Sequence, residues 1–180
     1  MGHRQSDLHI PSIANLIDGR AAPPASGQTF EKLRPADGSL LCNVGRSSPD
    51  DVAAAVDAAR AAQPSWTART PVERGELVRE LTLALRDRRE EAAAIVADET
   101  GKAHELALAE ADAAVEMGFF AAGEGRRLYG RTTTSAMQNR TVLATRRPVG
   151  VAGLIVSFNT PLPNYAWKAF PLSSAATPRF

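Results

Sequence analysis

The chain has 180 residues, 44% of them hydrophobic, with 21 Lys and Arg against 20 Asp and Glu. This is ordinary globular composition, and a net charge of +1 gives no reason to expect a nucleic-acid or membrane partner. The start lacks an apolar core of signal-peptide length, no run approaches a membrane span, and the single cysteine, Cys42, excludes an intrachain disulfide. We therefore expect a cytoplasmic protein.

The amino-terminal quarter is predicted to be extended. Residues 1–12 are polar and are expected to be disordered. Asp-Gly pairs at 18–19 and 37–38 are turn signals, and short apolar pieces lie at 29–33 and 40–44. The pattern predicts two or three short antiparallel strands.

Two helices follow. Ser48 is a good N-cap before Pro49 and two acidic residues, and this helix should end near Pro64. Residues 70–73, Thr-Pro-Val-Glu, form a capping box that starts a second helix running to about 98–100. Gly101 can end that helix or mark a break in it.

A third helix is predicted from about Lys102 to Glu124. Its spacing places five apolar residues on one side: Leu106, Ala109, Ala113, Met117 and Phe120. Residues 139–147 then alternate in polarity as an exposed strand does. The three histidines are scattered and lack metal-ligand spacing, so we expect no metal site.

The most informative stretch is 147–171. Residues 149–156 are apolar apart from two glycines, which suits a strand buried on both faces. The run breaks at 157–161 and resumes with helical spacing from about Leu162. Ligands of open parallel sheets bind just past the carboxyl end of such a strand, beside a helix N-terminus.

Residues 150–162, GVAGLIVSFNTPL, and 164–168, NYAWK, resemble the first cofactor-domain strand and loop of the NAD(P)-dependent aldehyde dehydrogenases. The family's usual loop is Pro-Trp-Asn-x-Pro. Here Ser157 and Phe158 replace the Pro and Trp, whereas Asn159 and Pro161 keep the register. The resemblance extends over residues 16–171 and includes the family's E-x-G-K corner at 99–102.

The resemblance implies an α/β fold: amino-terminal helices and short strands leading into the first strand and helix of an incomplete Rossmann-like cofactor domain. It divides the chain into residues 1–12, a family region at 13–172, and a non-family tail at 173–180. After Leu172 the sequence leaves the family pattern and shows neither helix nor strand periodicity. We expect a premature end or a change of reading frame there.

The resemblance also implies functional residues. Asn159 would donate its side-chain N–H to the oxyanion formed when a thiolate attacks an aldehyde; the alternative is a loop asparagine bonded to its own backbone. A nicotinamide cofactor, NAD or NADP, would be lined by four residues: Ile155, Val156, Ser157 and Phe158. They could equally be a core strand and its turn. Lys168 is either a supporting charge near the catalytic centre or a surface lysine.

The implied parent activity is oxidation of a small aldehyde to a carboxylic acid. The family's catalytic cysteine, general-base glutamate and Gly-rich cofactor loop all belong downstream of residue 172, so we expect this chain to be inactive alone. Full-length family members are expected to be homo-oligomers, with the strand at 139–147 in an arm that assembles them. The alternative is a non-catalytic helical oligomerisation or binding module.

Overall fold

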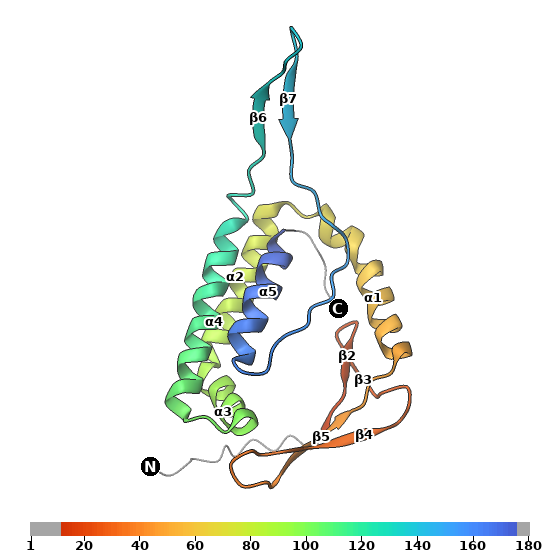
Figure 1. The fold of residues 1–180 in the computed structure, drawn as a ribbon, viewed down its shortest axis with the longest axis vertical. Coiled ribbons are helices and arrows are strands. Elements are labelled where there is room, and N and C mark those ends of the chain that lie inside the picture. The colour runs from red at the N-terminus through yellow and green to blue at the C-terminus, as the bar shows by residue number, and fades with distance from the viewer. Residues whose placement is uncertain (1–11, 176–180) are drawn as a thin grey trace.

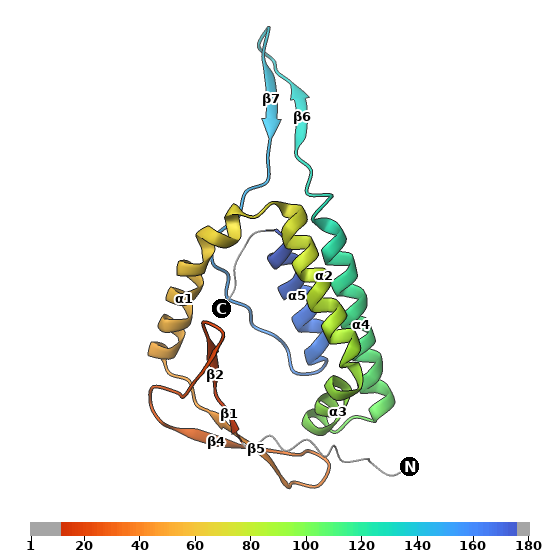
Figure 2. The same cartoon turned by 180° about the vertical axis from the view of Figure 1, so that it is seen from behind.

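The computed structural model describes residues 12–175. The predicted disorder of the amino terminus therefore lies outside the described residues, except at Ser12. Figures 1 and 2 show three layers of the molecule: short strands at one end, helices in the middle, and a narrow hairpin that projects from the other end. No helix within the described residues is long and apolar enough to cross a membrane.

The amino-terminal strands are more numerous than expected. They form a three-stranded sheet and a separate hairpin: β1 (Ser12–Ile13), β5 (Leu40–Gly45) and β4 (Thr29–Leu33) in the sheet, β2 (Asn15–Ile17) and β3 (Arg20–Ala22) in the hairpin. The pairing of β1 with β5 is parallel, so the prediction of antiparallel strands alone is wrong. The turn prediction is confirmed, because Asp18 (φ 53°) and Gly19 (φ 70°) take the left-handed conformation of a tight hairpin turn.

Both predicted capping boxes are present. At the start of α1 (Pro49–Ala68), Ser48 N–H donates to the Asp51 carboxylate over 2.7 Å, and Ser48 Oγ accepts from Asp51 N–H. At the start of α2 (Pro71–Asp87), Thr70 and Glu73 exchange the same two bonds. Each pair satisfies two backbone donors that a helix N-terminus leaves free.

Asp51 should make the stability of the fold depend on pH. Hydrogen bonds from the backbone N–H of Ser48 and of Ala25 lower the pKa of its carboxyl group. The stabilisation is therefore complete above the unfolded pKa of about 3.9 and is lost as the pH falls through the lower folded value. We expect Asp51→Asn to narrow the difference in urea midpoint between pH 7 and pH 3, whereas Asp50→Asn, on the exposed side of the same turn, should keep the wild-type difference.

Two helix boundaries differ from expectation. The prediction that α1 ends near Pro64 is wrong, since the helix continues to Ala68. A proline removes one helical hydrogen bond, but Trp66 Nε1 donates to the carbonyl of Ser173 over 3.1 Å and holds the last turn in place. The predicted second helix is broken at Arg88 (φ −106°, ψ 19°) into α2 and α3 (Arg89–Thr100).

The break at Arg88 lets α3 turn and pack on α4 (His104–Glu124) through small side chains. The buried cluster between them consists of Ala93, Val96, Ala97 and Ala107. Gly101, with φ 72°, ends α3 in the left-handed conformation that glycine adopts without steric cost, as predicted.

The buried face of α4 is not the predicted one. Leu106 and Phe120 are 63% and 57% exposed, whereas the helix buries its small residues: Ala107, Ala111, Ala114, Val115, Gly118 and Ala121. Because α4 packs against α2, α3 and α5 (Pro161–Ser174) together, the close approach of three helices selects side chains that occupy little space. A Cβ at Gly118 would meet the buried side chain of Thr82 on α2.

The predicted strand at 139–147 forms, but it is shorter and has a partner. It is β7 (Thr141–Ala144), which pairs in antiparallel register with β6 (Arg131–Thr134). The sequence signal for β6 was the run of β-branched threonines at 132–134. All eight strand residues are exposed, and the hairpin stands clear of the body in Figure 1.

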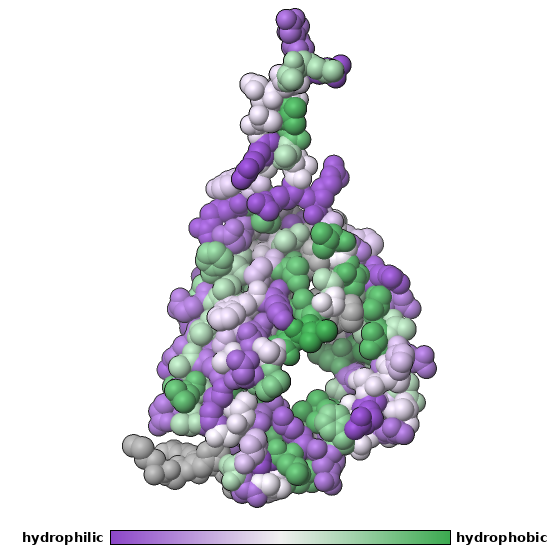
Figure 3. Space-filling model, in the orientation of Figure 1, coloured by the Kyte–Doolittle hydropathy of each residue, from purple (hydrophilic) through white to green (hydrophobic). Residues whose placement is uncertain are grey.

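The predicted buried strand at 149–156 does not form. The segment is extended chain with one isolated bridge at Ala152, and Val149 and Ile155 are 84% and 90% exposed. A parallel strand needs a parallel neighbour to bond its backbone groups, and none of the described residues supplies one. Figure 3 shows apolar surface gathered in the middle of the molecule, where this segment crosses between α1 and α5.

α5 continues past the expected family boundary at 172 and ends at Ser174. Its last carbonyl groups accept hydrogen bonds from the side chains of two other helices: Trp66 bonds Ser173, and Arg74 Nε bonds Ser174 over 3.1 Å. Burial lowers the pKa of Arg74, whose cation lies at the negative end of the α5 dipole. Residues 176–180 of the predicted tail lie outside the described residues.

Candidate functional site

The loop 157–160 joins the extended segment to α5, and it carries the asparagine singled out in the sequence. Ser157, Phe158 and Asn159 are exposed, and Thr160 precedes the first residue of α5. The prolines at 161 and 163 lie in the first helical turn, where a missing N–H costs nothing. The helix therefore starts directly after the loop and fixes its position at one end.

Asn164, one turn into α5, points its side-chain amide back at the loop. Its Nδ2 lies 2.7 Å from Ser157 Oγ, 2.9 Å from Thr160 Oγ1 and 3.4 Å from Asn159 Oδ1. Sequence reasoning assigned no role to this residue. The available signal was local: an amide in the first helical turn lies within reach of a polar loop that ends at the helix.

A second contact reaches the loop from α4's side of the molecule. Lys102 Nζ donates to the backbone carbonyl of Asn159 over 2.9 Å and forms an ion pair with Glu110. The Lys102 and Glu110 side chains are 18% and 10% exposed, so water screens this pair only weakly. Sequence reasoning placed Lys102 in a helix corner and missed its contact with the loop.

Of the two polar atoms of the Asn159 side-chain amide, only the oxygen has a hydrogen-bond partner among the described residues. Its Oδ1 faces Asn164, whereas its Nδ2 donates to no acceptor within residues 12–175. Within the described residues, the contact of the Asn159 side chain is with Asn164. An exposed N–H donor on an anchored loop can bind the oxygen of a small molecule.

The other predicted site residues lie along the preceding segment. Ile155 and Phe158 are 90% and 89% exposed, while Val156 is half-buried against a neighbouring hollow. Lys168, on α5, donates to the backbone carbonyl of Ile155. It therefore ties the helix to the segment, and it lies on the same side of α5 as Asn164, one turn further along.

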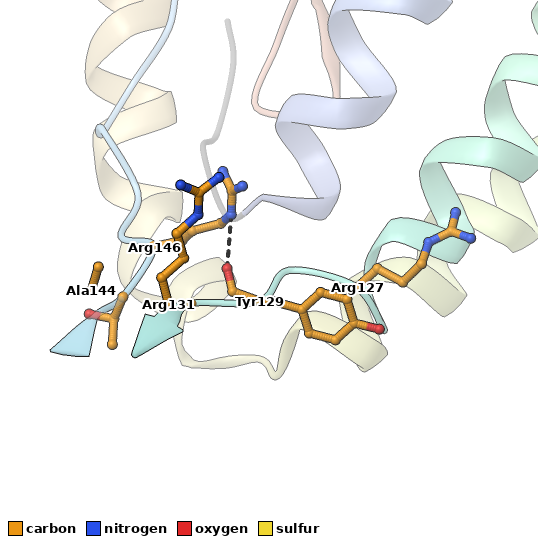
Figure 4. A pocket seen from close by; sticks show the side chains of 7 residues that line it. Arg127, Tyr129, Arg131, Ala144 and Arg146 are labelled. Carbon is orange, nitrogen blue, oxygen red and sulfur yellow. Dashed lines mark hydrogen bonds between the residues drawn. The ribbon is translucent and has the colours of Figure 1, made fainter. Parts of the chain in front are cut away.

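Two hollows lie near these elements. One, of about 520 Å³, is lined mostly by apolar residues of β2, α1 and the extended segment, together with Tyr165 and the β2–β3 turn at Asp18 and Gly19. The other, of about 450 Å³, lies at the base of the β6–β7 hairpin, where Arg146 Nε donates to the carbonyl of Tyr129 over 3.1 Å (Figure 4). Asn159 lines neither of these two hollows and is itself exposed.

The other residues considered as catalytic groups or metal ligands, Cys42 and the histidines, form no such site within residues 12–175. Cys42 is buried, and burial together with the nearby Glu99 carboxylate raises the pKa of its thiol, which opposes formation of a nucleophilic thiolate. His104 lies 3.2 Å from Glu90 on the surface. Among residues 12–175 no group of His, Cys, Asp and Glu side chains could hold a metal ion.

Comparison with known proteins places the loop within a match to one protein family. The aldehyde dehydrogenase family model matches residues 22–175, which is most of the chain and includes Asn159, Asn164 and Lys168. This chain belongs to the aldehyde dehydrogenase family. The family match also explains the helices, the short strands and the α5 start, since the chain has the α/β fold of aldehyde dehydrogenases over the part it covers.

Two relatives compared by sequence and one solved structure illustrate the similarity. The chain is 33% identical over 162 residues to the alpha-ketoglutarate semialdehyde dehydrogenase of Haloferax volcanii, and 29% identical over 160 residues to the NADP(+) succinate-semialdehyde dehydrogenase GabD of Escherichia coli. These matches span 89% of this chain in both cases. The crystal structure of an NAD-dependent aldehyde dehydrogenase from Sinorhizobium meliloti superposes with a TM-score of 0.90 at 29% identity, over 99% of this chain.

The chain spans about a third of the length of these relatives. It covers 34% of the Haloferax enzyme, 33% of GabD and 37% of the Sinorhizobium structure. The aldehyde dehydrogenase region present here is thus the one that leads up to and includes the Asn159 loop and α5.

Proposed function

We propose that this chain is the amino-terminal part of an aldehyde dehydrogenase that oxidises a small aldehyde to a carboxylic acid with NAD⁺ or NADP⁺, and that the 180 residues alone are inactive. The observation that carries the proposal is the Asn159 side chain: an amide whose N–H donates to no acceptor among the described residues, on a loop anchored from two sides. Family membership supplies the reaction class.

Asn159 would act on the oxygen of the aldehyde. When a thiolate attacks the carbonyl carbon, the carbon–sulfur bond forms and the π electrons move to oxygen, which becomes negatively charged. An N–H donor at a fixed position stabilises that charge by about 3 kcal/mol, because it needs no reorganisation as the charge develops. The thiolate would come from a cysteine downstream of residue 172, since Cys42 is buried and its thiol pKa is raised.

The cofactor, when bound, would accept the hydride from the substrate carbon. The segment 155–158 fits one wall of its site, because Ile155 and Phe158 present exposed apolar side chains and the backbone between them is not paired in a sheet. Lys168 would hold that wall against α5 through the Ile155 carbonyl and would place a positive charge beside it.

The proposal is tested by sequencing the encoding DNA across codon 172 and well beyond it, and by expressing the complete product in any restored frame. We expect a downstream cysteine and glutamate, and reduction of NAD⁺ or NADP⁺ at 340 nm when an aldehyde is added. The 180-residue chain alone should give no reduced cofactor. Turnover by the short chain, or a complete product without the cysteine, would contradict the proposal.

A second function has one observation in its favour. The β6–β7 hairpin exposes all eight strand residues, including the apolar Val142 and Leu143, which suits association with another copy. As a non-catalytic oligomerisation module, the wild-type chain would sediment as a stable oligomer. Leu143→Lys should dissociate this oligomer, whereas the control Thr133→Lys, on the partner strand, should leave it intact. A wild-type chain that sediments as a monomer rules this function out.

A further inference from the structure

The Asn159 loop has Ser157 at the position where the loop that it resembles has proline. Serine does not fix the backbone φ angle just before Phe158 and Asn159, as proline would. Both of these residues are exposed and receive little support from packing. An oxyanion donor must nevertheless be held close to one position to be effective. The loop therefore needs another source of rigidity.

The Asn164 amide supplies rigidity to the side chains. An amide nitrogen carries two hydrogens, and its two short contacts, 2.7 Å to Ser157 Oγ and 2.9 Å to Thr160 Oγ1, account for both. The contact to Asn159 Oδ1 at 3.4 Å is longer and shares one of them. The Asn159 side chain thus presents its oxygen to Asn164, while its own Nδ2 donates to no acceptor within residues 12–175.

Lys102 supplies rigidity to the backbone. Its ammonium bonds the Asn159 carbonyl oxygen, and the ion pair with Glu110 of α4 keeps the lysine in place. Two oxygens of Asn159 are thus held, the backbone oxygen by Lys102 in the connection between α3 and α4 and the side-chain oxygen by Asn164 of α5. Only the side-chain donor is left available.

We propose that Asn164 is a positioning residue for Asn159: its side-chain N–H groups bridge Ser157, Thr160 and Asn159 and aim the Asn159 donor at the substrate oxygen, in place of the proline that the loop lacks. The catalytic use of this arrangement rests on the proposed function. The arrangement itself is a property of the 180-residue chain and can be measured without any activity.

The test uses the chain labelled with ¹⁵N-asparagine, which gives five side-chain amide pairs. Asn159→Ala identifies the Asn159 pair by its loss. In the wild type we expect that pair to be ordered, with an order parameter of about 0.8, and in Asn164→Asp to fall below about 0.6. Aspartate has the same shape as asparagine but no N–H donor, so the variant loses the bond to Asn159 Oδ1 and gains a negative charge.

Asn139→Asp, in the exposed hairpin turn, is the matched control and should leave the Asn159 pair unchanged. Circular dichroism and the thermal midpoint should show Asn164→Asp folded, which separates a local effect from unfolding. An Asn159 pair that is already mobile in the wild type, or that stays ordered in Asn164→Asp, overturns the proposal, because the bonds then either do not form or do not restrain Asn159.

The effect of Asn164 on catalysis is measured in the complete product. Asn164→Asp should lower kcat about 10- to 100-fold with little change in KM, and should have no further effect in an Asn159→Ala background, since both changes remove the same donor. If Asn164→Asp lowers kcat by the same factor in the wild-type and in the Asn159→Ala background, Asn164 does not act through Asn159 and the proposal is overturned. If the amide measurement succeeds but the complete product has no aldehyde activity, the proposed function fails and the positioning role of Asn164 stands.

Discussion

Replacing Asn159 with alanine in the complete enzyme is expected to lower kcat about 100- to 1,000-fold, because one oxyanion donor is worth about that much. The loss should appear in kcat rather than in KM, since the donor bonds the oxygen strongly only after charge has developed on it. Steady-state assays with saturating aldehyde and cofactor measure the effect.

Two further variants make the result specific. Asn159→Asp keeps the shape but replaces the donor with a negative charge, so it should be at least as impaired as Asn159→Ala. Gln138→Ala, in the exposed hairpin turn, should retain wild-type kcat. A loss of less than about threefold in Asn159→Ala would show that Asn159 does not bind the developing oxyanion.

Phe170→Ala is expected to reduce the free energy of unfolding by about 3–5 kcal/mol. Phe170 is 3% exposed and is the one large side chain in a buried cluster otherwise made of Val78, Ala114, Ala121 and Ala166. The alanines cannot move to fill the space that the ring leaves. Since small domains are stable by only about 5–15 kcal/mol, the change removes a large part of the total. Urea unfolding followed by circular dichroism measures it.

The matched control is Phe158→Ala. Phe158 is 89% exposed, so the same truncation there should change stability by about 0.5 kcal/mol or less. Equal effects at the two positions would mean that α5 is not packed in the core. That packing matters for the site, because α5 carries Asn164 and Lys168 and its docking positions the Asn159 loop.

Local chemistry explains which features of the sequence were predictable. The capping boxes at Ser48 and Thr70, the turn at Asp18-Gly19 and the end of α3 at Gly101 each depend on residues within a few positions of one another. The free energies of these caps and turns depend little on the rest of the fold, so the sequence patterns predict them reliably. Asn159 could be singled out for a different reason, the register of several unlike residues around it.

The remaining features depend on contacts between distant parts of the chain. Residues 149–156 have the composition of a buried strand, but a strand is stable only with a neighbour to bond, and the described chain offers none. The buried face of α4 was set by its packing against α2, α3 and α5, which favours alanine over the leucine and phenylalanine that periodicity suggested.

The same division holds for the site. The family, the loop that carries Asn159 and the start of α5 beside it could be read from the residues themselves, and the Asn164 contacts lie within seven residues of the loop. The Lys102 contact depends on the fold, because Lys102 lies 57 residues from Asn159 and its bond exists only when α4 and α5 pack together. Contacts between distant segments depend on how whole helices pack, and no local pattern in the chain encodes that packing.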